Sequence, residues 1–319
     1  MLTSVQKVFL THVQSEYGIL QQITAKQIKY VSVKYGIPYP QWLTKDQYRI
    51  SRSLYRIPGE TMISQPTESK EEISARIRET YEAMDELVQA VAANTVNSLV
   101  IAGGAGLGKS YTVNKTLQKV NQGDYGYVFH RGYLKATHLF RLLYENRFKG
   151  QVVVLDDCDL WHDETALNIL KAALELKPTR RIGWGSEKVF LDEDGEEIPR
   201  YFDFEGSVIF LTNLSVRDLI ASGSKNAPHL AAIESRSLLL DLKIKTKEEY
   251  MIKIKQTLEG GMLRDIGITK PQEEEIVSFM EDNIEKLSDV SLRMIEKIAA
   301  LYKAKPESWM KICRTVCFK

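Results

Sequence analysis

The clearest chemistry in this sequence belongs to a glycine-rich run, Gly103-Gly-Ala-Gly-Leu-Gly-Lys-Ser110, which matches the pattern G-x-x-x-x-G-K-S in full. Glycines let the backbone fold closely around a phosphate, so that successive N–H groups and the dipole of a following helix point at the anion. An apolar strand-like run, Leu99-Val-Ile-Ala102, precedes the motif and a helical pattern follows it, as this kind of site requires. That context disfavours the alternative, a glycine-rich turn that binds nothing.

Side chains of this loop are expected to hold a nucleotide and its metal ion. We expect Lys109 to reach the β- and γ-phosphates, where it also serves catalysis, and Ser110 to hold Mg²⁺. The residues expected to line the nucleotide are Gly103, Gly104, Ala105, Gly106, Leu107, Gly108, Lys109, Ser110 and Tyr111. The sequence therefore predicts ATP and Mg²⁺ as ligands.

A pair of carboxylates follows a second apolar run. The stretch Gln151-Val-Val-Val-Leu-Asp156-Asp157 is typical of a buried parallel strand that ends in two acids. We expect Asp156 to fix Mg²⁺ through its water shell and Asp157 to orient or deprotonate the attacking water, with Asp159 as the fallback base. An acidic loop without such a role is the alternative, and the intact phosphate loop makes it the weaker one.

Short apolar runs alternate with helical stretches through the middle of the chain. The runs fall at 98–102, 125–129, 152–155, 208–212 and 238–242, an arrangement typical of a parallel α/β sheet. A capping pair, Ser69 and Glu72, begins a helix ahead of them, and after residue 243 helix signals continue without strand signals. We expect about four helices between residues 246 and 316.

With both motifs and these elements in place, the chain resembles the AAA+ ATPases over roughly residues 75–319. The resemblance implies a P-loop parallel-sheet core, an all-helical C-terminal lid, Mg²⁺-dependent hydrolysis of ATP and a homo-oligomeric ring, typically a hexamer. It also implies a polar sensor that orients the attacking water, matched by Asn213 at the end of the fourth apolar run. An arginine that reaches the neighbouring subunit's site is matched by Arg236, and a second sensor at the start of a lid helix by Arg293.

Each of these arginines has a second interpretation. Arg236 could cap the end of its own helix by contacting the last carbonyl groups, and Arg293 could pair with Glu296 on the lid surface. Three other arginines are alternative trans-acting groups: Arg180, Arg181 and Arg217. These alternatives stay open at the level of sequence.

The second motif departs from the commonest family pattern, which ends in Asp-Glu, because this chain has Asp156-Asp157. Aspartate is one methylene shorter than glutamate, so it needs a closer water or a different loop geometry. Bacterial helicase loaders and replication initiators of the same superfamily also carry Asp-Asp. The departure therefore favours work on nucleic acid.

An insertion lies between the second motif and the sensor strand. Strand-like runs at 181–186 and 188–204 around Asp194-Gly195 predict a β-hairpin, which in helicases and initiators of the resembled superfamily can enter the central channel. The tip is acidic, which suits DNA phosphates poorly and favours a structural or subunit-contact role; its acids are Asp192, Glu193, Asp194, Glu196 and Glu197. A shorter loop at 131–135 could project Tyr133 and Lys135, although an ordinary strand-to-helix connection is an equal alternative.

The first sixty residues differ from the rest in charge. They carry eight basic and three acidic side chains, a formal charge of +5 within a chain total of +1, which leaves −4 for the remaining 259 residues. A helical pattern at 25–34 and a β-like pair at 48–50 and 53–58 predict a small winged-helix-like module, similar to N-terminal modules of phage-encoded ATPases. We expect Trp42 and Tyr55 in its core. Basic residues that could neutralise DNA phosphates are Lys26, Lys29, Arg49, Arg52 and Arg56, and a protein-docking module is the alternative.

Composition excludes several classes of protein. Apolar residues make up 44% and charged residues 27%, which excludes a wholly disordered chain and collagen. No apolar run approaches the roughly 18 residues of a membrane helix, and the N-terminus has no signal-peptide pattern. The three cysteines, Cys158, Cys313 and Cys317, are too few and too badly spaced for a disulfide framework or a zinc site. We therefore expect no membrane partner and a cytoplasmic protein, in the host cytoplasm if it is phage-encoded.

Together these features predict a basic module at 1–60, a linker at 61–70, a nucleotide-binding core at 71–243 and a helical lid at 244–319. The expected activity is that of an ATP-hydrolysing ring acting on DNA or on a DNA-replication complex, in the manner of a helicase or helicase loader. One alternative is a remodeller of proteins that uses the N-terminal module to dock an adaptor. The other is a nucleotide-dependent assembly switch that turns over slowly.

Overall fold

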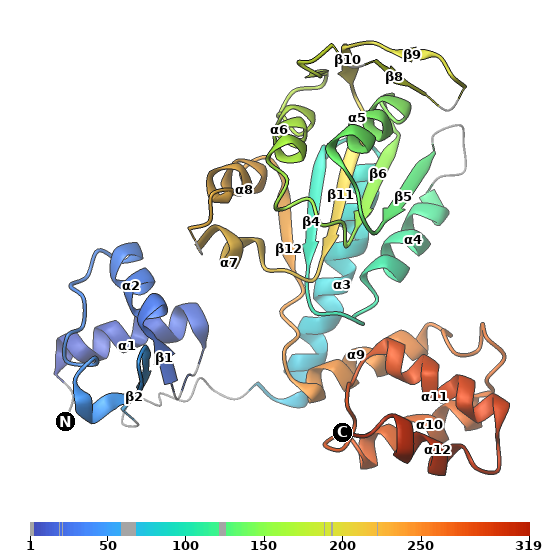
Figure 1. The fold of residues 1–319 in the computed structure, drawn as a ribbon. Coiled ribbons are helices and arrows are strands. Elements are labelled where there is room, and N and C mark those ends of the chain that lie inside the picture. The colour runs from blue at the N-terminus through green and yellow to red at the C-terminus, as the bar shows by residue number, and fades with distance from the viewer. Residues whose placement is uncertain are drawn as a thin grey trace. The chain divides into compact units, whose positions relative to one another are not determined.

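The computed structural model describes residues 3–18, 20, 22–58, 68–120, 126–187, 189–192, 194–221 and 223–319. Contacts divide the chain into two compact units, Met1–Glu68 and Ser69–Lys319 (Figure 1). Most of the expected linker, residues 61–67, lies outside the described residues. Among those described, none of the helices combines the length and the apolar character that a membrane crossing requires.

The first unit contains two helices and a small antiparallel sheet. Its helices are α1 (Ser4–Tyr17) and α2 (Ala25–Lys34), and a 3-10 turn, η1 (Asp46–Tyr48), precedes its last two strands. The sheet has the order β1 (Gln22–Thr24), β3 (Leu54–Arg56), β2 (Arg49–Ser51). The sequence predicted α2 and the β2–β3 pair but neither α1 nor β1. A three-residue strand such as β1 carries too little pattern of its own and depends on its partner β3.

Apolar side chains from both helices and the sheet form the core of this unit. Tyr55 is buried in this core as predicted, and Trp42 is partly buried and packs edge-on against the core residue Phe9, at 6.5 Å between ring centroids. The five basic residues proposed to meet DNA are all exposed: Lys26, Lys29, Arg49, Arg52 and Arg56. The winged-helix designation of this unit stays a prediction.

The second unit is built on a five-stranded parallel sheet with the order β12-β4-β11-β6-β5. Its strands are β4 (Ser98–Ala102), β5 (Tyr127–Arg131), β6 (Val152–Asp156), β11 (Ser207–Thr212) and β12 (Leu238–Asp241). Every residue of β4, β6 and β11 is buried, as expected for strands covered on both faces. All five predicted apolar runs contain strands, with small shifts at their ends, although residue 125 of the second run lies outside the described residues.

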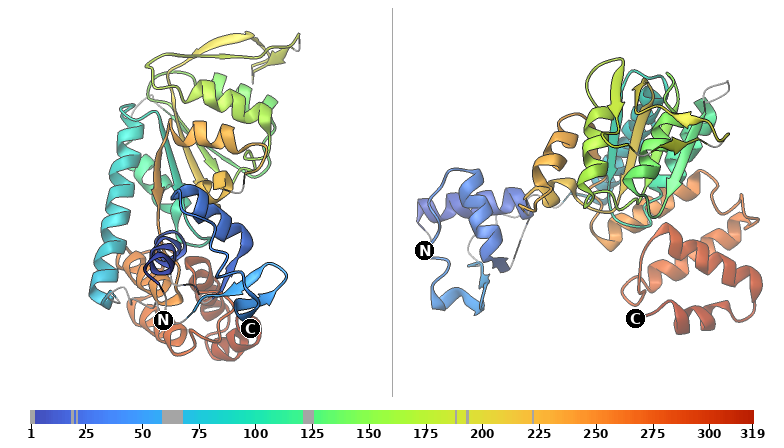
Figure 2. Two further views of the ribbon diagram at one scale, coloured as in Figure 1. Left: turned by 90° about the vertical axis from the view of Figure 1, so that its left-hand side faces the viewer. Right: turned by 45° about the horizontal axis from the view of Figure 1, so that its top comes forward.

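Helices cover both faces of this sheet (Figures 1 and 2). They are α3 (Lys70–Ala92), α4 (Lys109–Val120), α5 (Ala136–Glu145), α6 (Glu164–Ala173), α7 (Val216–Ala221) and α8 (Ala227–Glu234). Successive strand residues point to opposite faces, so Leu99 and Ile101 pack with α3 and α4, whereas Val100 packs with α5, α6 and α8. The three-layer α/β P-loop core is therefore confirmed.

The insertion forms a long antiparallel hairpin. β7 (Arg180–Gly183) pairs with β10 (Tyr201–Phe204), and β8 (Phe190–Leu191) pairs with β9 (Glu197–Ile198) beyond them. Gly195, at the predicted turn, has a φ of 82°, a value that favours glycine. The hairpin prediction is confirmed, although Glu193 of its acidic tip lies outside the described residues.

After residue 243 the chain contains four helices, the number predicted. They are α9 (Lys247–Glu259), α10 (Lys270–Asp282), α11 (Leu292–Ala304) and α12 (Trp309–Val316). Capping boxes at Thr246 and Thr269 begin α9 and α10. These helices share their own apolar core, in which Cys313 and Cys317 are buried as free thiols.

Candidate functional site

The carboxyl ends of the central strands meet at one edge of the sheet and bring most of the predicted residues together. β4, β11 and β6 are adjacent and parallel, so the loops that follow them open on the same side. A pocket of about 160 Å³ lies there, lined by residues 106–111, Asp156, Asp157 and Asn213. The C-terminal region adds Met262, from the turn after α9, and Leu292, Arg293 and Glu296, from α11. Gly103, Gly104 and Ala105 lie outside its wall.

Lys109 is buried at the first position of α4 and folds back over the loop. Its ammonium donates to the carbonyl oxygens of Gly103 and Gly104 at 2.7 and 2.9 Å, and to Asn213 Oδ1 at 2.7 Å. Burial lowers the pKa of Lys109, an effect that the nearby carboxylates oppose. The Lys109 ammonium is therefore held in the wall of the pocket by two loop carbonyls and Asn213.

The predicted metal residues contact each other directly. Ser110 Oγ donates to Asp156 Oδ1 at 2.9 Å. A hydroxyl beside a carboxylate fits Mg²⁺, which prefers oxygen ligands and is usually bound through one or two carboxylates together with waters and substrate phosphates. The second carboxylate oxygen of Asp156 accepts from Arg131 Nε at 2.9 Å.

The sequence did not predict Arg131 as a charged residue of this site, although its guanidinium contacts Asp156. It is the last residue of β5 and lies directly opposite Asp156 in the β5–β6 register. The sequence signal for Arg131 was its place at the carboxyl end of a predicted neighbouring strand.

The loop that follows β5 exposes Tyr133, whose side chain is 76% exposed, as the projecting-loop hypothesis requires.

Asp157 and Asn213 both line the pocket and contact each other directly. Asn213 Nδ2 donates to Asp157 Oδ2 at 2.6 Å, while Asn213 Oδ1 accepts from Lys109, so one amide joins the acid to the lysine. Asp157 has a φ of 52° and its backbone N–H donates to Leu211 O at 2.9 Å. A left-handed backbone is uncommon outside glycine and is tolerated best by residues such as Asp and Asn.

The first turn of α11 closes the pocket from the lid. Leu292 donates its backbone N–H to the Gly106 carbonyl at 2.9 Å, which places the next residue, Arg293, in the pocket wall. Gly106 has a φ of 73°, and a side chain there would come within 2.4 Å of Ser291 Cβ. Glu296, the alternative partner of Arg293, lines the same pocket.

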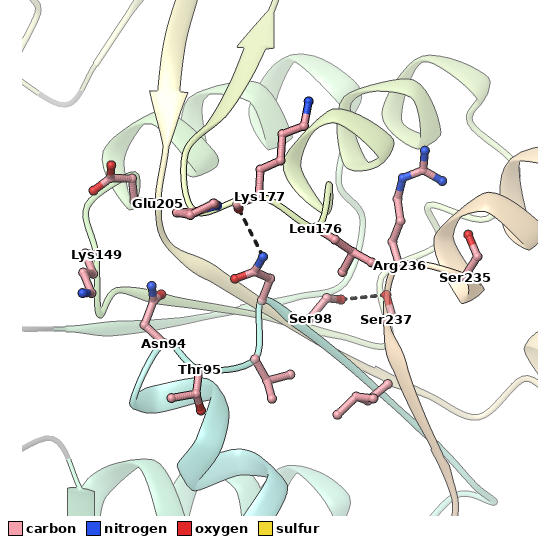
Figure 3. A pocket seen from close by; sticks show the side chains of 14 residues that line it. Asn94, Thr95, Ser98, Lys149, Leu176, Lys177, Glu205, Ser235, Arg236 and Ser237 are labelled. Atoms are coloured by element: carbon pink, nitrogen blue, oxygen red, sulfur yellow. Dashed lines mark hydrogen bonds between the residues drawn. The ribbon is translucent and has the colours of Figure 1, made fainter.

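Arg236 lies at the other edge of the sheet, just before β12, and outside its own chain's pocket. Its Nε and Nη2 donate to Glu175 Oε1 at 3.1 and 2.8 Å, and its Nη1 donates to Ala232 O at 2.8 Å. The last contact is the helix-capping interaction that the sequence left open as an alternative. Figure 3 shows Arg236 at the rim of a separate pocket of about 750 Å³, beside the hydrogen bond between Ser98 and Ser237.

The three alternative arginines have different surroundings. Arg180 is 2% exposed and donates to the carbonyl oxygens of Phe204 and Gly206, so its guanidinium is not accessible to a second chain. Burial lowers the pKa of Arg180 to about 10. Arg181 stacks on Tyr201, and Arg217 is exposed beside Glu234 at 3.1 Å. Only Arg181 and Arg217 therefore remain as alternatives to Arg236.

Comparisons with known proteins give one relative and several distant folds. No family model matches the chain. An uncharacterized 36.7 kDa protein from Enterobacteria phage T4, from the nrdC–mobD intergenic region, is 33% identical over 254 residues, 78% of this chain and 77% of the relative. Of solved structures, RuvB from Thermotoga maritima has 15% identity, a TM-score of 0.42, and coverage of 78% of this chain and 70% of that one.

A second solved structure is NtrX from Brucella abortus in complex with ATP. It has 12% identity and a TM-score of 0.43, and the match covers 76% of this chain and 52% of NtrX. Superpositions this distant transfer no activity. The relative from phage T4 is far more similar in sequence, over more than three quarters of both chains. This chain belongs to the same protein family as that phage T4 protein.

Proposed function

We propose that this chain is an AAA+-type ATPase that hydrolyses ATP with Mg²⁺ at the carboxyl edge of its sheet. The observation that carries the proposal is the hydrogen-bonded series Lys109–Asn213–Asp157, with Ser110 and Asp156 bonded to each other beside it. Phosphoryl transfer depends chiefly on positioning and on stabilising charge, and this series supplies a cation, a metal pair and a base within one pocket.

Each residue then has a defined task. Loop amides and the N-terminus of α4 bind the phosphates, and Lys109 exchanges carbonyl contacts for phosphate oxygens. Ser110 and Asp156 would hold Mg²⁺, which would neutralise phosphate charge. Asp157 accepts the proton of the attacking water, and Asn213 holds that carboxylate in place.

Two arginines complete the proposed reaction. Arg293 enters the pocket from the lid and senses the terminal phosphate, so that nucleotide state is linked to lid position. Arg236 lies outside its own chain's pocket, so it is proposed to act in the pocket of a neighbouring subunit within a homo-oligomeric ring, proposed to be a hexamer. Hydrolysis then requires assembly, because the trans-acting arginine and the pocket belong to different chains.

We propose DNA, or a replication complex on DNA, as the substrate of this motor. The supporting observation is in the first unit, where five basic side chains are exposed while the aromatic residues Trp42 and Tyr55 are used in the core. Basic side chains of this kind bind phosphates without regard to sequence. A protein adaptor docked on the same unit, and a slow nucleotide-dependent assembly switch, are the competing functions.

One experiment tests these statements together. ATP hydrolysis is measured with and without single-stranded DNA, and the mass in solution is measured with and without ATP. Turnover in an ATP-dependent oligomer, stimulated by DNA, is the expected result. Stimulation by a protein with no binding of DNA would move the function to protein remodelling, and tight ATP binding with very slow turnover would indicate the switch.

A further inference from the structure

Tyr81, in the middle of α3, reaches the phosphate loop from inside the apolar core. Its side chain is 8% exposed and belongs to the cluster that contains Leu107, Val113 and Leu117. Its hydroxyl donates a hydrogen bond of 2.6 Å to the carbonyl oxygen of Leu107. Burial raises the pKa of Tyr81, so the phenol keeps its proton and remains a donor.

The Leu107 carbonyl belongs to the peptide group that also carries the Gly108 N–H. In a trans peptide these two groups point in opposite directions, and the described residues contain no cis peptide bond. Because Tyr81 holds the oxygen inside the core, the Gly108 N–H is turned away from the core. Gly108 lines the pocket immediately before α4, where backbone N–H groups are the donors that bind phosphate.

This peptide is free to rotate unless something holds it. Leu107 stands between Gly106 and Gly108, whose φ angles are 73° and 79°. Glycine adopts positive and negative φ angles about equally readily, so the backbone itself imposes little preference on the orientation of this peptide. A rotated peptide would present its oxygen to the phosphates and would repel them.

A second contact fixes the ring of Tyr81 from the lid. The Lys253 ammonium, on α9, lies 3.2 Å from the centroid of the ring and is itself 8% exposed. A desolvated cation over an aromatic face is attracted by the ring quadrupole. Tyr81 therefore contacts the phosphate loop with its hydroxyl and the lid with its ring.

We propose that Tyr81 is a positioning residue that sets the orientation of the Leu107–Gly108 peptide for nucleotide binding and connects that peptide to lid helix α9. The inference rests on the proposed nucleotide-binding function, but the orientation itself is a property of the chain without nucleotide. A tyrosine that only fills the core would need its ring and not its hydroxyl. The substitution Tyr81→Phe separates these two roles because it keeps the ring and the contact with Lys253.

The first measurement uses the nucleotide-free chain. Amide hydrogen exchange of residues 105–110 is compared between wild type, Tyr81→Phe and the matched control Tyr127→Phe. Tyr127 packs against the same apolar cluster as Tyr81 and donates to Asn114 Oδ1 at 3.1 Å, so the control also loses one hydroxyl bond. Faster exchange in the loop for Tyr81→Phe alone is expected. Equal exchange in all three chains would overturn the proposal.

The second measurement is the dissociation constant for ATP by calorimetry, with KM and kcat for hydrolysis. Loss of one buried hydrogen bond to the loop should weaken ATP binding and raise KM about tenfold, with kcat changed by less than about threefold. Wild-type affinity in Tyr81→Phe, or an equal loss in Tyr127→Phe, contradicts the positioning role. A wild-type chain that binds no ATP overturns the proposed function instead, and the exchange measurement still decides the orientation of the peptide.

Discussion

The two edges of the central sheet carry the charged groups of the proposed reaction, and they are built differently. At the carboxyl edge, Lys109, Asn213 and Asp157 form one hydrogen-bonded series within a single chain. At the amino edge, Arg236 stands outside that pocket and is held by Glu175. The first edge brings its charged groups together within one chain, whereas the role proposed for Arg236 at the second edge requires a neighbouring chain.

This difference separates ATP binding from ATP hydrolysis, which a single activity measurement would combine. Binding of ATP should belong to the individual chain, because the groups proposed to hold phosphate and metal follow adjacent strands of one sheet. Hydrolysis should belong to the assembly, because the role proposed for Arg236 places it in a second chain's pocket. The predictions below test this separation, beginning with the largest expected effect.

Replacing Lys109 with alanine should remove the cation from the carboxyl edge. We expect hydrolysis to fall on the order of 10³-fold, with ATP binding lost in parallel, because a buried charge partner of the phosphates is deleted. Steady-state turnover and calorimetry measure the two effects. Lys119→Ala, an exposed lysine on the same helix, should change neither. Full turnover in Lys109→Ala would show that hydrolysis occurs elsewhere.

Replacing Arg236 with alanine should affect hydrolysis and spare binding. We expect turnover to fall roughly 300-fold, as for other groups that stabilise transition-state charge, while the dissociation constant for ATP stays within about twofold. Turnover and mass in solution are measured on the same sample, so that loss of assembly is distinguished from loss of the arginine side chain. If Arg217→Ala gives this result and Arg236→Ala does not, the trans-acting arginine has been assigned to the wrong residue.

Replacing Asp157 with asparagine should remove the proposed base but leave the hydrogen-bonding position filled. A loss of about 100-fold in kcat is expected, with little change in ATP binding, because general-base catalysis supplies effects of this size. Asp159→Asn is the matched control for the neighbouring acid. A larger loss in the control than in Asp157→Asn would transfer the base to Asp159.

Replacing Arg131 with glutamine should change the metal dependence of the carboxyl edge. Its guanidinium lies on the same carboxylate that is proposed to hold Mg²⁺. Removing that positive charge should lower the Mg²⁺ concentration for half-maximal turnover by roughly threefold to tenfold at low salt. Arg147→Gln, on a different surface, is the control. An increase in the required Mg²⁺ would mean that Arg131 mainly orients Asp156.

Much of the architecture could be predicted because it depends on local pattern. The apolar runs of β4, β6 and β11 are buried on both faces and therefore read as continuous hydrophobic stretches. Capping residues such as Ser69 and Thr246 mark helix starts through their own side-chain hydrogen bonds. Short strands such as β1 exist only through pairing and were missed for that reason.

Contacts between residues far apart in the sequence could not be predicted from local pattern. Arg131 meets Asp156 because of the register between β5 and β6, and Tyr81 meets Leu107 because α3 packs beside α4. Glu175 was not foreseen as the partner of Arg236, although the contact of that arginine with its own helix was an open alternative. No local rule specifies such pairs.

The sequence by itself determined that this chain has a phosphate loop, a strand ending in two acids, a parallel sheet and a helical lid, since each depends on residue types at short spacing. Only the tertiary structure decided which side chains share the pocket, that Arg180 is buried, and that Arg236 lies at the other edge. The physical reason is that strand order, register and helix packing join residues far apart in the chain. Local sequence specifies the elements, and the burial of their apolar faces against one another specifies how those elements meet.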